Sequence, residues 1–344
     1  MFAVSWIVSV IFFVGMFVVI HFFSRMSSLG GALESYAKSG HSAWSVFLNY
    51  YAVTVPFILV EVLPFTVLMG AMWAVQQMSR RNELTLLMTS GVSCKRLFLP
   101  VLLLAFLIGL GFSVVKEEAL PELALERRRM NQMIKGRGED RLDRLTLIAD
   151  GSGHWFSIGE YDIRKRTAYN VDILDAKDPG VHLGRISAMQ YQTRKNGGAG
   201  WYALPDAEVT GGLEFPLATD LTPQDIEIEA SSLRHLSVKN LKRLIARNPD
   251  KLNLKVLQHA HYVYPLSPLI LLLLGLPFVV RSRGRSPFVA AGMSLMLSVA
   301  YFSVQSILRE MGTRGDLIDP LLGAWLPVVI FGSFGLVLYE TMPS

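Results

Sequence analysis

The stretch Leu97-Phe-Leu-Pro-Val-Leu-Leu-Leu-Ala-Phe-Leu-Ile-Gly-Leu-Gly-Phe-Ser-Val-Val115 decides the class of fold, because it is apolar throughout and contains no charged residue. A bilayer core requires about 20 mostly apolar residues per helix, and this stretch has that length. Five further stretches meet the same criterion: Phe2–Phe23, Tyr51–Gln76, His261–Val280, Pro287–Leu308 and Pro320–Tyr339. The sequence therefore predicts an α-helical polytopic membrane protein with six transmembrane helices.

Composition supports this class. The 344 residues are 51% hydrophobic and 18% charged, and the mean hydropathy is +0.37. Soluble domains carry about 25% charged residues, so little polar material is left for a water-facing surface. The net charge is +5, and the basic residues fall beside apolar spans, where positive charge indicates membrane orientation. We therefore expect no nucleic-acid partner. The single cysteine, Cys94, excludes an intramolecular disulfide.

Three spans precede and three follow a long polar region, which gives a 3+3 arrangement. We expect residues 1–118 to hold the first three spans, 119–256 a β-rich domain, and 257–344 the last three spans. The first span starts without a basic segment and is longer than the apolar part of a cleaved signal, so we expect it to be retained. Whether the native N-terminus extends further is left open.

The short loops predict the orientation, because Lys and Arg in such loops resist translocation. Seven basic residues follow spans two and four, against four in the short loops of the opposite side. The seven are Arg80, Arg81, Lys95, Arg96, Arg281, Arg283 and Arg285, and the four are Arg25, Lys38, Arg309 and Arg314. Both termini are thus expected in the cytoplasm and the large domain outside.

The inserted domain has short runs of two-residue alternation. Val171 and Ile173 alternate with polar residues, as do Ile226 and Ile228, which predicts strands at both places. Residues 122–135 have the pattern of a helix that continues span three outward. Ser237 is expected to cap a helix over 238–246. Short strands with close turns suggest a sandwich or jelly-roll-like sheet.

The loop after span two is the most informative segment. A short helix is expected over 79–93, with Ser79 as its N-cap and Gly91 at its end. Leu84, Leu87 and Met88 share one face of that helix, and Arg80, Arg81, Asn82 and Glu83 occupy its start. One interpretation is a basic helix lying on anionic lipid. The other is a helix that docks on a cytoplasmic partner, with Glu83 as the polar contact.

Candidate sites elsewhere are weaker. Glu61 lies inside span two between Pro56 and Pro64, and an ionisable group inside a span is costly and a functional candidate; it also lies within reach of the outer interface. The prolines suit either a moving bundle or static irregular packing. No phosphate-binding loop or zinc-hydrolase motif occurs in the sequence, so we expect no catalytic residue, no metal site and no cofactor on this chain.

Several motifs together resemble one family. They are Leu63-Pro-Phe-Thr-Val-Leu-Met-Gly-Ala71, Arg80-Arg-Asn-Glu-Leu84, Ser90-Gly-Val-Ser93, Tyr264-Pro-Leu-Ser-Pro268, Leu274-Gly-Leu-Pro277 and Gly323-Ala-Trp-Leu-Pro327. Their order and spacing resemble the YjgP/YjgQ (LptF/LptG) permeases of the lipopolysaccharide export ABC transporter, over the whole chain.

The resemblance implies an inner-membrane permease subunit that acts as a heterodimer with a second, homologous permease and with a dimeric cytoplasmic ATPase. It implies that ATP and Mg²⁺ bind the ATPase, and that lipopolysaccharide is extracted from the outer leaflet of the inner membrane. The lipid then passes through the periplasmic domain to a bridge protein, as expected for outer-membrane biogenesis. The loop helix would be the coupling helix, with Glu83 as its acidic contact. The resemblance does not separate the LptF-like from the LptG-like partner.

One departure concerns the lipid head group. Some relatives carry several lysines at the outer end of span one, suited to phosphates. Here only Arg25 and Lys38 stand there, with His21 below them. Two other functions stay open on the residues alone: a membrane-anchored periplasmic sensor or scaffold, and a membrane-embedded lipid-modifying enzyme.

Overall fold

The computed structural model describes residues 2–38, 43–134, 141–175, 181–193, 199–230, 235–281, 287–315 and 317–342. The chain divides into two compact units. Residues 1–26, 51–120 and 251–344 form the first, which we call the helical unit. Residues 27–50 and 121–250 form the second, which holds the β-sheet and which we call the sheet unit.

Long apolar helices make up the helical unit. Four described segments are long and apolar enough to cross a bilayer: Phe2–Ser24 of α1 (Phe2–Lys38), Phe47–Arg80 of α2 (Ala43–Arg80), Cys94–Arg128 of α4 (Cys94–Ile134), and α10 (Pro320–Glu340). The pair α7 (Leu252–Val263) and α8 (Leu266–Arg281) passes the same test together, which raises the number to five. The chain is therefore a multi-pass membrane protein.

The expected fourth span is not one straight helix. Its two halves are bent by 60° at Tyr264 and Pro265. Pro265 and Pro268 both lack a backbone N–H, so two hydrogen bonds that would continue α7 into α8 cannot form. The expected count of six spans is not confirmed, since the fifth of them, α9 (Pro287–Arg314), contains side chains outside the described residues.

Close packing joins the helices of this unit. The buried core is formed by apolar side chains of α2, α4, α8 and α9, among them Leu68, Phe98, Leu274 and Tyr301. Gly70 of α2 lies directly against α1, because a Cβ placed there would approach the Cα of Trp6 to 2.6 Å. Small residues allow such close approach where no hydrophobic effect drives helices together in lipid.

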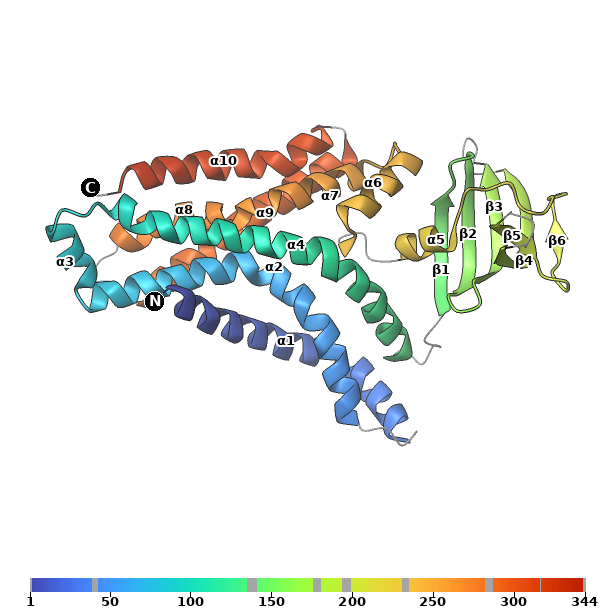
Figure 1. Ribbon diagram of the computed structural model, residues 1–344, viewed down its shortest axis with the longest axis horizontal. Helices are drawn as coiled ribbons and strands as arrows, with labels where there is room; N and C mark the ends of the chain where they lie inside the picture. Colours follow the sequence, from blue (N-terminus) through green and yellow to red (C-terminus); the bar gives the residue numbers. More distant parts are fainter. Residues whose placement is uncertain are drawn as a thin grey trace. The chain divides into compact units, whose positions relative to one another are not determined.

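The described strands of the sheet unit form one antiparallel sheet. They are β1 (Arg141–Ala149), β2 (His154–Asp162), β3 (Thr167–Asp175), β4 (His182–Thr193), β5 (Ala199–Ala203) and β6 (Val209–Thr210). The order is β1-β2-β3-β4-β5, with β6 paired to β4 (Figure 1). Sequential neighbours pair throughout this path, as in a meander. The jelly-roll-like arrangement that we expected is therefore not confirmed among the described strands.

Residue alternation explains the core of the sheet. Val171 and Ile173 of β3 are buried and Asn170 of the same strand is exposed, as the sequence predicted. Trp201 of β5 is fully buried and donates a hydrogen bond from Nε1 to the carbonyl of Leu221 at 2.7 Å. The core is closed by Ile226, which comes from a helix rather than a strand.

The strand expected around Ile226 and Ile228 is wrong, because Pro223–Ala230 forms helix α5. The backbone N–H and hydroxyl of Thr222 both donate to the Asp225 carboxylate, in the manner of a capping box. Pro223 occupies the first helical position, where its missing N–H costs nothing. The run Thr222-Pro-Gln-Asp225 is a helix-start signal that two-residue alternation concealed.

Two other expectations for the insert are confirmed. The helix of span three continues into the insert without a break, because α4 reaches Ile134. Helix α6 (Val238–Arg247) begins as predicted, with the Ser237 side chain accepting a hydrogen bond from the Asn240 N–H at 3.2 Å. The sequence also predicts close turns at Asp178-Pro-Gly180 and Asn196-Gly-Gly198, and both lie outside the described residues.

Candidate functional site: the segment between α2 and α4 and the polar clusters

The loop after α2 holds a shorter helix than expected. Helix α2 continues through Ser79 to Arg80, and helix α3 spans Glu83–Thr89. Asn82 is its N-cap, in the left-handed conformation with φ 60°, and no side chain caps the helix. Asn is one of the few residues that tolerate this conformation. Ser79 is thus not the N-cap; Gly91, with φ 85°, ends the segment as expected.

Leu84 fixes α3 to the helical unit. Its side chain is 1% exposed and belongs to the same core as Cys94 and Phe98 of α4. Met88 packs against this core, and the Cys94 Sγ lies 3.5 Å from the Met88 Sδ. The apolar face predicted for this helix therefore packs, through Leu84 and Met88, against the protein itself. Leu87 is half-buried.

The opposite side of α3 is open. Arg80, Arg81 and Asn82 are exposed at the turn, and the Glu83 carboxylate is 40% exposed with Arg81 at 3.9 Å. Leu86 is 66% exposed, although sequence reasoning did not select it. An apolar side chain beside an acidic one on a short, anchored helix is a surface suited to contact with another protein.

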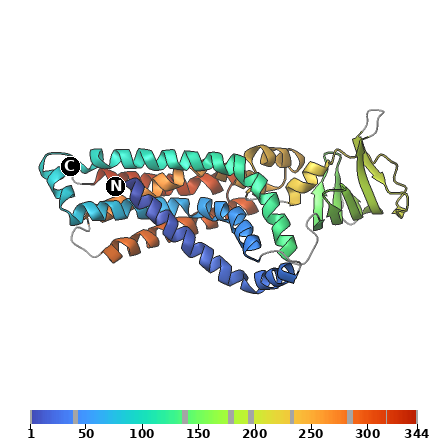
Figure 2. The same cartoon turned by 60° about the horizontal axis from the view of Figure 1, so that its bottom comes forward.

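The end of α10 fastens the other side of this segment. The Lys95 Nζ forms an ion pair with the Glu340 carboxylate at 2.6 Å, and the Tyr339 hydroxyl donates to the Lys95 carbonyl at 2.6 Å. Met342 is buried in the same core as Leu84. Figures 1 and 2 show α3 at the turn between α2 and α4, near the C-terminal end of the chain. No local sequence signal marks these contacts, because the partners are 244 or more positions apart.

The expected head-group residues are described only in part. His21 of α1 lies 3.4 Å from the Tyr51 hydroxyl of α2, measured from Nδ1, with the two rings edge to face. The backbone of Arg25 and Lys38 belongs to α1, but their side chains lie outside the described residues. The structure brings His21 against α2 and leaves the basic rim a prediction.

Glu61 is exposed on α2, and a polar cluster lies in its neighbourhood. Glu61, Glu117 and Arg309 all exert an electrostatic influence on the Lys116 ammonium. The ammonium also lies 4.8 Å from the centre of the Tyr264 ring, and His261 Nδ1 is 4.0 Å from the Glu117 carboxylate. Acidic and basic groups are mixed here, so the cluster balances its own charge within the helical unit.

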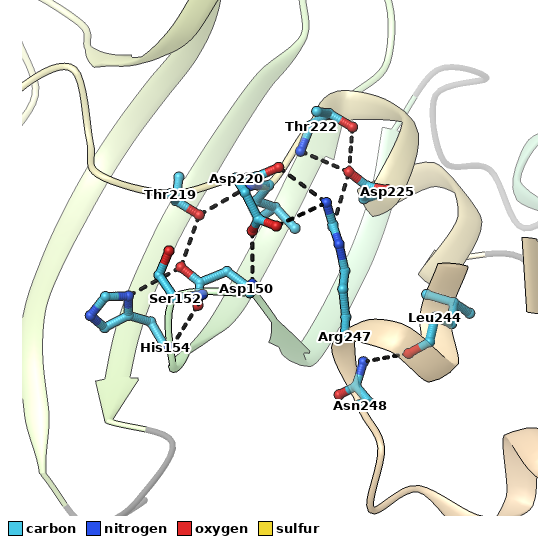
Figure 3. A network of polar contacts seen from close by, with 12 residues as sticks. Asp150, Ser152, His154, Thr219, Asp220, Thr222, Asp225, Leu244, Arg247 and Asn248 are labelled. Carbon is cyan, nitrogen blue, oxygen red and sulfur yellow. Dashed lines mark hydrogen bonds and ion pairs between the residues drawn. The ribbon is translucent and has the colours of Figure 1, made fainter. Parts of the chain in front are cut away.

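A second polar network lies in the sheet unit (Figure 3). Asp150 accepts from the N–H of His154 at 2.6 Å and from the Thr219 hydroxyl at 3.0 Å, and its carboxylate lies 3.1 Å from the His154 Nδ1. Arg247 at the end of α6 forms ion pairs with Asp220 at 3.4 Å and with the buried Asp225 at 2.9 Å. These contacts tie α5 and α6 to the first hairpin, which is a structural role.

Among the described residues, no group of three or more His, Cys, Asp or Glu is arranged to hold a metal ion. The described residues thus form long apolar helices, an exposed anchored turn between two of them, and internally balanced polar clusters. The apolar helices define a multi-pass membrane protein. The sequence model of the family described as "Lipopolysaccharide export system permease LptF/LptG" matches residues 2–341.

This match covers essentially the whole chain, so the protein belongs to the LptF/LptG family, whose members are lipopolysaccharide export permeases. A direct comparison with curated proteins finds no match.

Proposed function

We propose that this chain is one permease subunit of an ABC transporter that extracts lipopolysaccharide from the outer leaflet of the inner membrane. The subunit has six spans, with α7 and α8 as the broken fourth and α9 as the fifth. Its termini and the α3 turn lie in the cytoplasm, and its sheet unit lies in the periplasm. The family membership and the bias of basic residues support this arrangement.

The partners follow from the same proposal. A second, homologous permease completes the cavity, a cytoplasmic ATPase dimer binds ATP and Mg²⁺, and a periplasmic bridge accepts the lipid. This chain holds no cofactor and performs no catalysis. His21, Arg25 and Lys38 attract the charged head group at the outer rim, and Glu61 adds an acidic group there. Electrostatic attraction of this kind is strongest where water is partly excluded.

The exposed side of α3 carries the proposal. Glu83 and Leu86 contact the ATPase, while the buried Leu84 holds the helix in place between α2 and α4. Arg80, Arg81, Asn82, Leu87, Met88 and Gly91 shape and support the turn. ATPase closure can drive the permease only if the ATPase contacts one permease conformation better than the other. A short rigid helix fixed to two long helices transmits such a preference.

The first test compares Glu83→Ala with Glu310→Ala in the complex purified with its partners. Glu310 is a matched control, since it is exposed and pairs with a neighbouring arginine, Arg314, as Glu83 pairs with Arg81. We expect Glu83→Ala to reduce ATPase assembly and the ATP-dependent transfer of lipopolysaccharide from proteoliposomes to the bridge protein. Glu310→Ala should leave both unchanged. If Glu83→Ala leaves assembly and transfer intact, the coupling role is wrong.

A second test separates contact from support within α3. Leu86→Ala removes an exposed side chain and should weaken ATPase binding with no change in thermal stability. Leu84→Ala removes a buried side chain and should destabilise the chain by about 2–5 kcal/mol. Equal effects of the two substitutions on stability and on ATPase binding would contradict the assignment of the two faces.

A further inference from the structure

Pro64 creates a defect in α2 that the rest of the helix cannot repair. In an α-helix the carbonyl of residue i accepts a hydrogen bond from the N–H of residue i+4. The partner of the Val60 carbonyl would be residue 64, which is proline and has no N–H. Val60 is 4% exposed, so a carbonyl without a partner there would be costly.

Tyr264 supplies the missing donor. Its hydroxyl donates to the Val60 carbonyl at 2.8 Å, across 204 positions of sequence. Tyr264 stands at the break between α7 and α8, where the chain bends by 60°. The donor that repairs one proline defect therefore sits at another proline defect of the helical unit.

The α4 helix packs closely against the same break. A Cβ on Gly109 would approach the Pro265 carbonyl oxygen to 2.5 Å, so only glycine allows α4 to pack this closely. The Lys116 ammonium lies over the Tyr264 ring, at 4.8 Å from its centre, which favours the observed orientation of the ring. The break itself is stabilised locally. Pro268 has no N–H to donate to the Tyr264 carbonyl, and the Ser267 N–H donates to it instead.

We propose that Tyr264 is a latch that joins α2, at the hydrogen bond that Pro64 leaves open, to the α7–α8 break, so that the two irregular spans move as one. α2 ends at the turn that carries α3, and α7 follows directly on the chain from the sheet unit. A change in the tilt of α2 then reaches the break through one hydrogen bond. Pro64 in α2 and Pro265 at the break are therefore parts of one latch.

A double-mutant cycle tests the latch. Tyr264→Phe removes the hydroxyl and strands the Val60 carbonyl, whereas Pro64→Ala restores an N–H that can satisfy the same carbonyl within α2. In the purified chain we expect Tyr264→Phe to lower the unfolding midpoint by about 2–4 °C. In the Pro64→Ala background the same substitution should cost much less. A cost that is equal in both backgrounds would overturn the proposal.

Tyr262→Phe is the control, because this tyrosine of α7 is 45% exposed and its change should not shift the midpoint. Pro64→Leu repeats the cycle if Pro64→Ala does not fold. If neither Pro64 variant folds, the unfolding midpoint of Tyr264→Phe is compared directly with that of Tyr262→Phe. An unchanged midpoint in Tyr264→Phe overturns the latch.

A functional measurement distinguishes a latch from a purely structural contact. This part rests on the proposed transport function. Tyr264→Phe should raise the ATP hydrolysed per lipid transferred, because the two spans no longer move together. A purely structural contact would lower both rates in proportion and leave the ratio unchanged, which would limit Tyr264 to a static role and overturn the latch. Absence of any ATPase partner would refute the transport proposal and leave the thermal cycle as a valid test.

Discussion

Large apolar side chains are exposed on α1 of the helical unit but buried in the core of the sheet unit. In α1, Ile11 and Phe12 are 68% and 63% exposed, and no residue of the apolar segment of this helix is fully buried. In the sheet, Trp201 and Tyr161 are fully buried. Within residues 141–250, the described exposed large hydrophobic side chains are Val181 and Val209. Lipid tails solvate apolar side chains and water does not, so the same residue types face outward in one unit and inward in the other.

The two units also differ in how their buried polar groups find hydrogen-bond partners. The helical unit satisfies the backbone defect at the Val60 carbonyl by the hydroxyl of a tyrosine from a distant helix. The sheet unit instead joins two buried acids, Asp150 and Asp225, in one network with Thr219 and Arg247. A membrane protein has no water to pair such groups inside its spans, so each defect requires its own donor.

The largest effect is expected from replacing a buried tryptophan by alanine, and the same replacement of an exposed tryptophan is the comparison. Trp201→Ala removes a fully buried side chain and its hydrogen bond, and should destabilise the sheet unit by about 3–5 kcal/mol. Trp73→Ala removes a side chain of α2 that is 55% exposed and should change stability little. Pulse proteolysis of residues 121–250 in the purified chain measures the first effect, and thermal unfolding of the purified chain in lipid nanodiscs measures the second. Similar losses for the two tryptophans would contradict the assignment of Trp73 to a lipid-facing position.

The next effect concerns the buried charges. Arg247→Ala leaves the Asp225 carboxylate, which is 4% exposed, without its cation, and should destabilise the sheet unit by about 3 kcal/mol. The matched control is Arg185→Ala, which removes an exposed pair with Asp172 and should cost less than about 1 kcal/mol. Chemical unfolding followed by the same proteolysis compares them. An equal cost would show that Arg247 contributes no more than a surface pair.

Tyr161 links stability to alkaline pH. Burial raises the pKa of its hydroxyl above the usual value of 10.0, with the Glu227 carboxylate adding to the effect. Because the folded state holds this proton more tightly than the unfolded state, the contribution is complete below pH 10 and is lost as the pH rises further. Unfolding measured between pH 9 and pH 11 should therefore show a decline that Tyr161→Phe reduces.

The same variant has an expected effect near neutral pH. Among the described residues the Tyr161 hydroxyl has no hydrogen-bond partner, so its removal should be neutral or stabilise the fold by about 1 kcal/mol. A clear loss of stability in Tyr161→Phe at pH 7 would show that the hydroxyl has a partner in solution.

The smallest effect is expected at the edge of the helical unit. Glu340→Gln removes the ion pair with Lys95, but Glu340 is 72% exposed, so the loss should stay below about 1 kcal/mol. Thermal unfolding in lipid nanodiscs at low and high salt measures it, and high salt should reduce the difference further. A loss that salt does not change would argue for a bond that is better shielded than its exposure indicates.

The sequence by itself determined the features that depend on neighbouring residues. Span length identified the membrane class, the Ser237 cap located α6, and alternation located the buried face of β3. The Thr222–Asp225 capping box was also local, and the misassigned strand at Ile226 shows that alternation and a helix start can coexist in one segment. The family motifs identified the LptF/LptG membership that the match over residues 2–341 confirms.

Only the tertiary structure decided which side of α3 is available and which residues repair the proline defects. Leu84 faces the core because α4 supplies Cys94 and Phe98 beside it, and no property of the loop alone gives that direction. The donor for the Val60 carbonyl lies 204 positions away at Tyr264. Proline marks in the sequence where a hydrogen bond is missing, but the partner that replaces it depends on how distant helices pack.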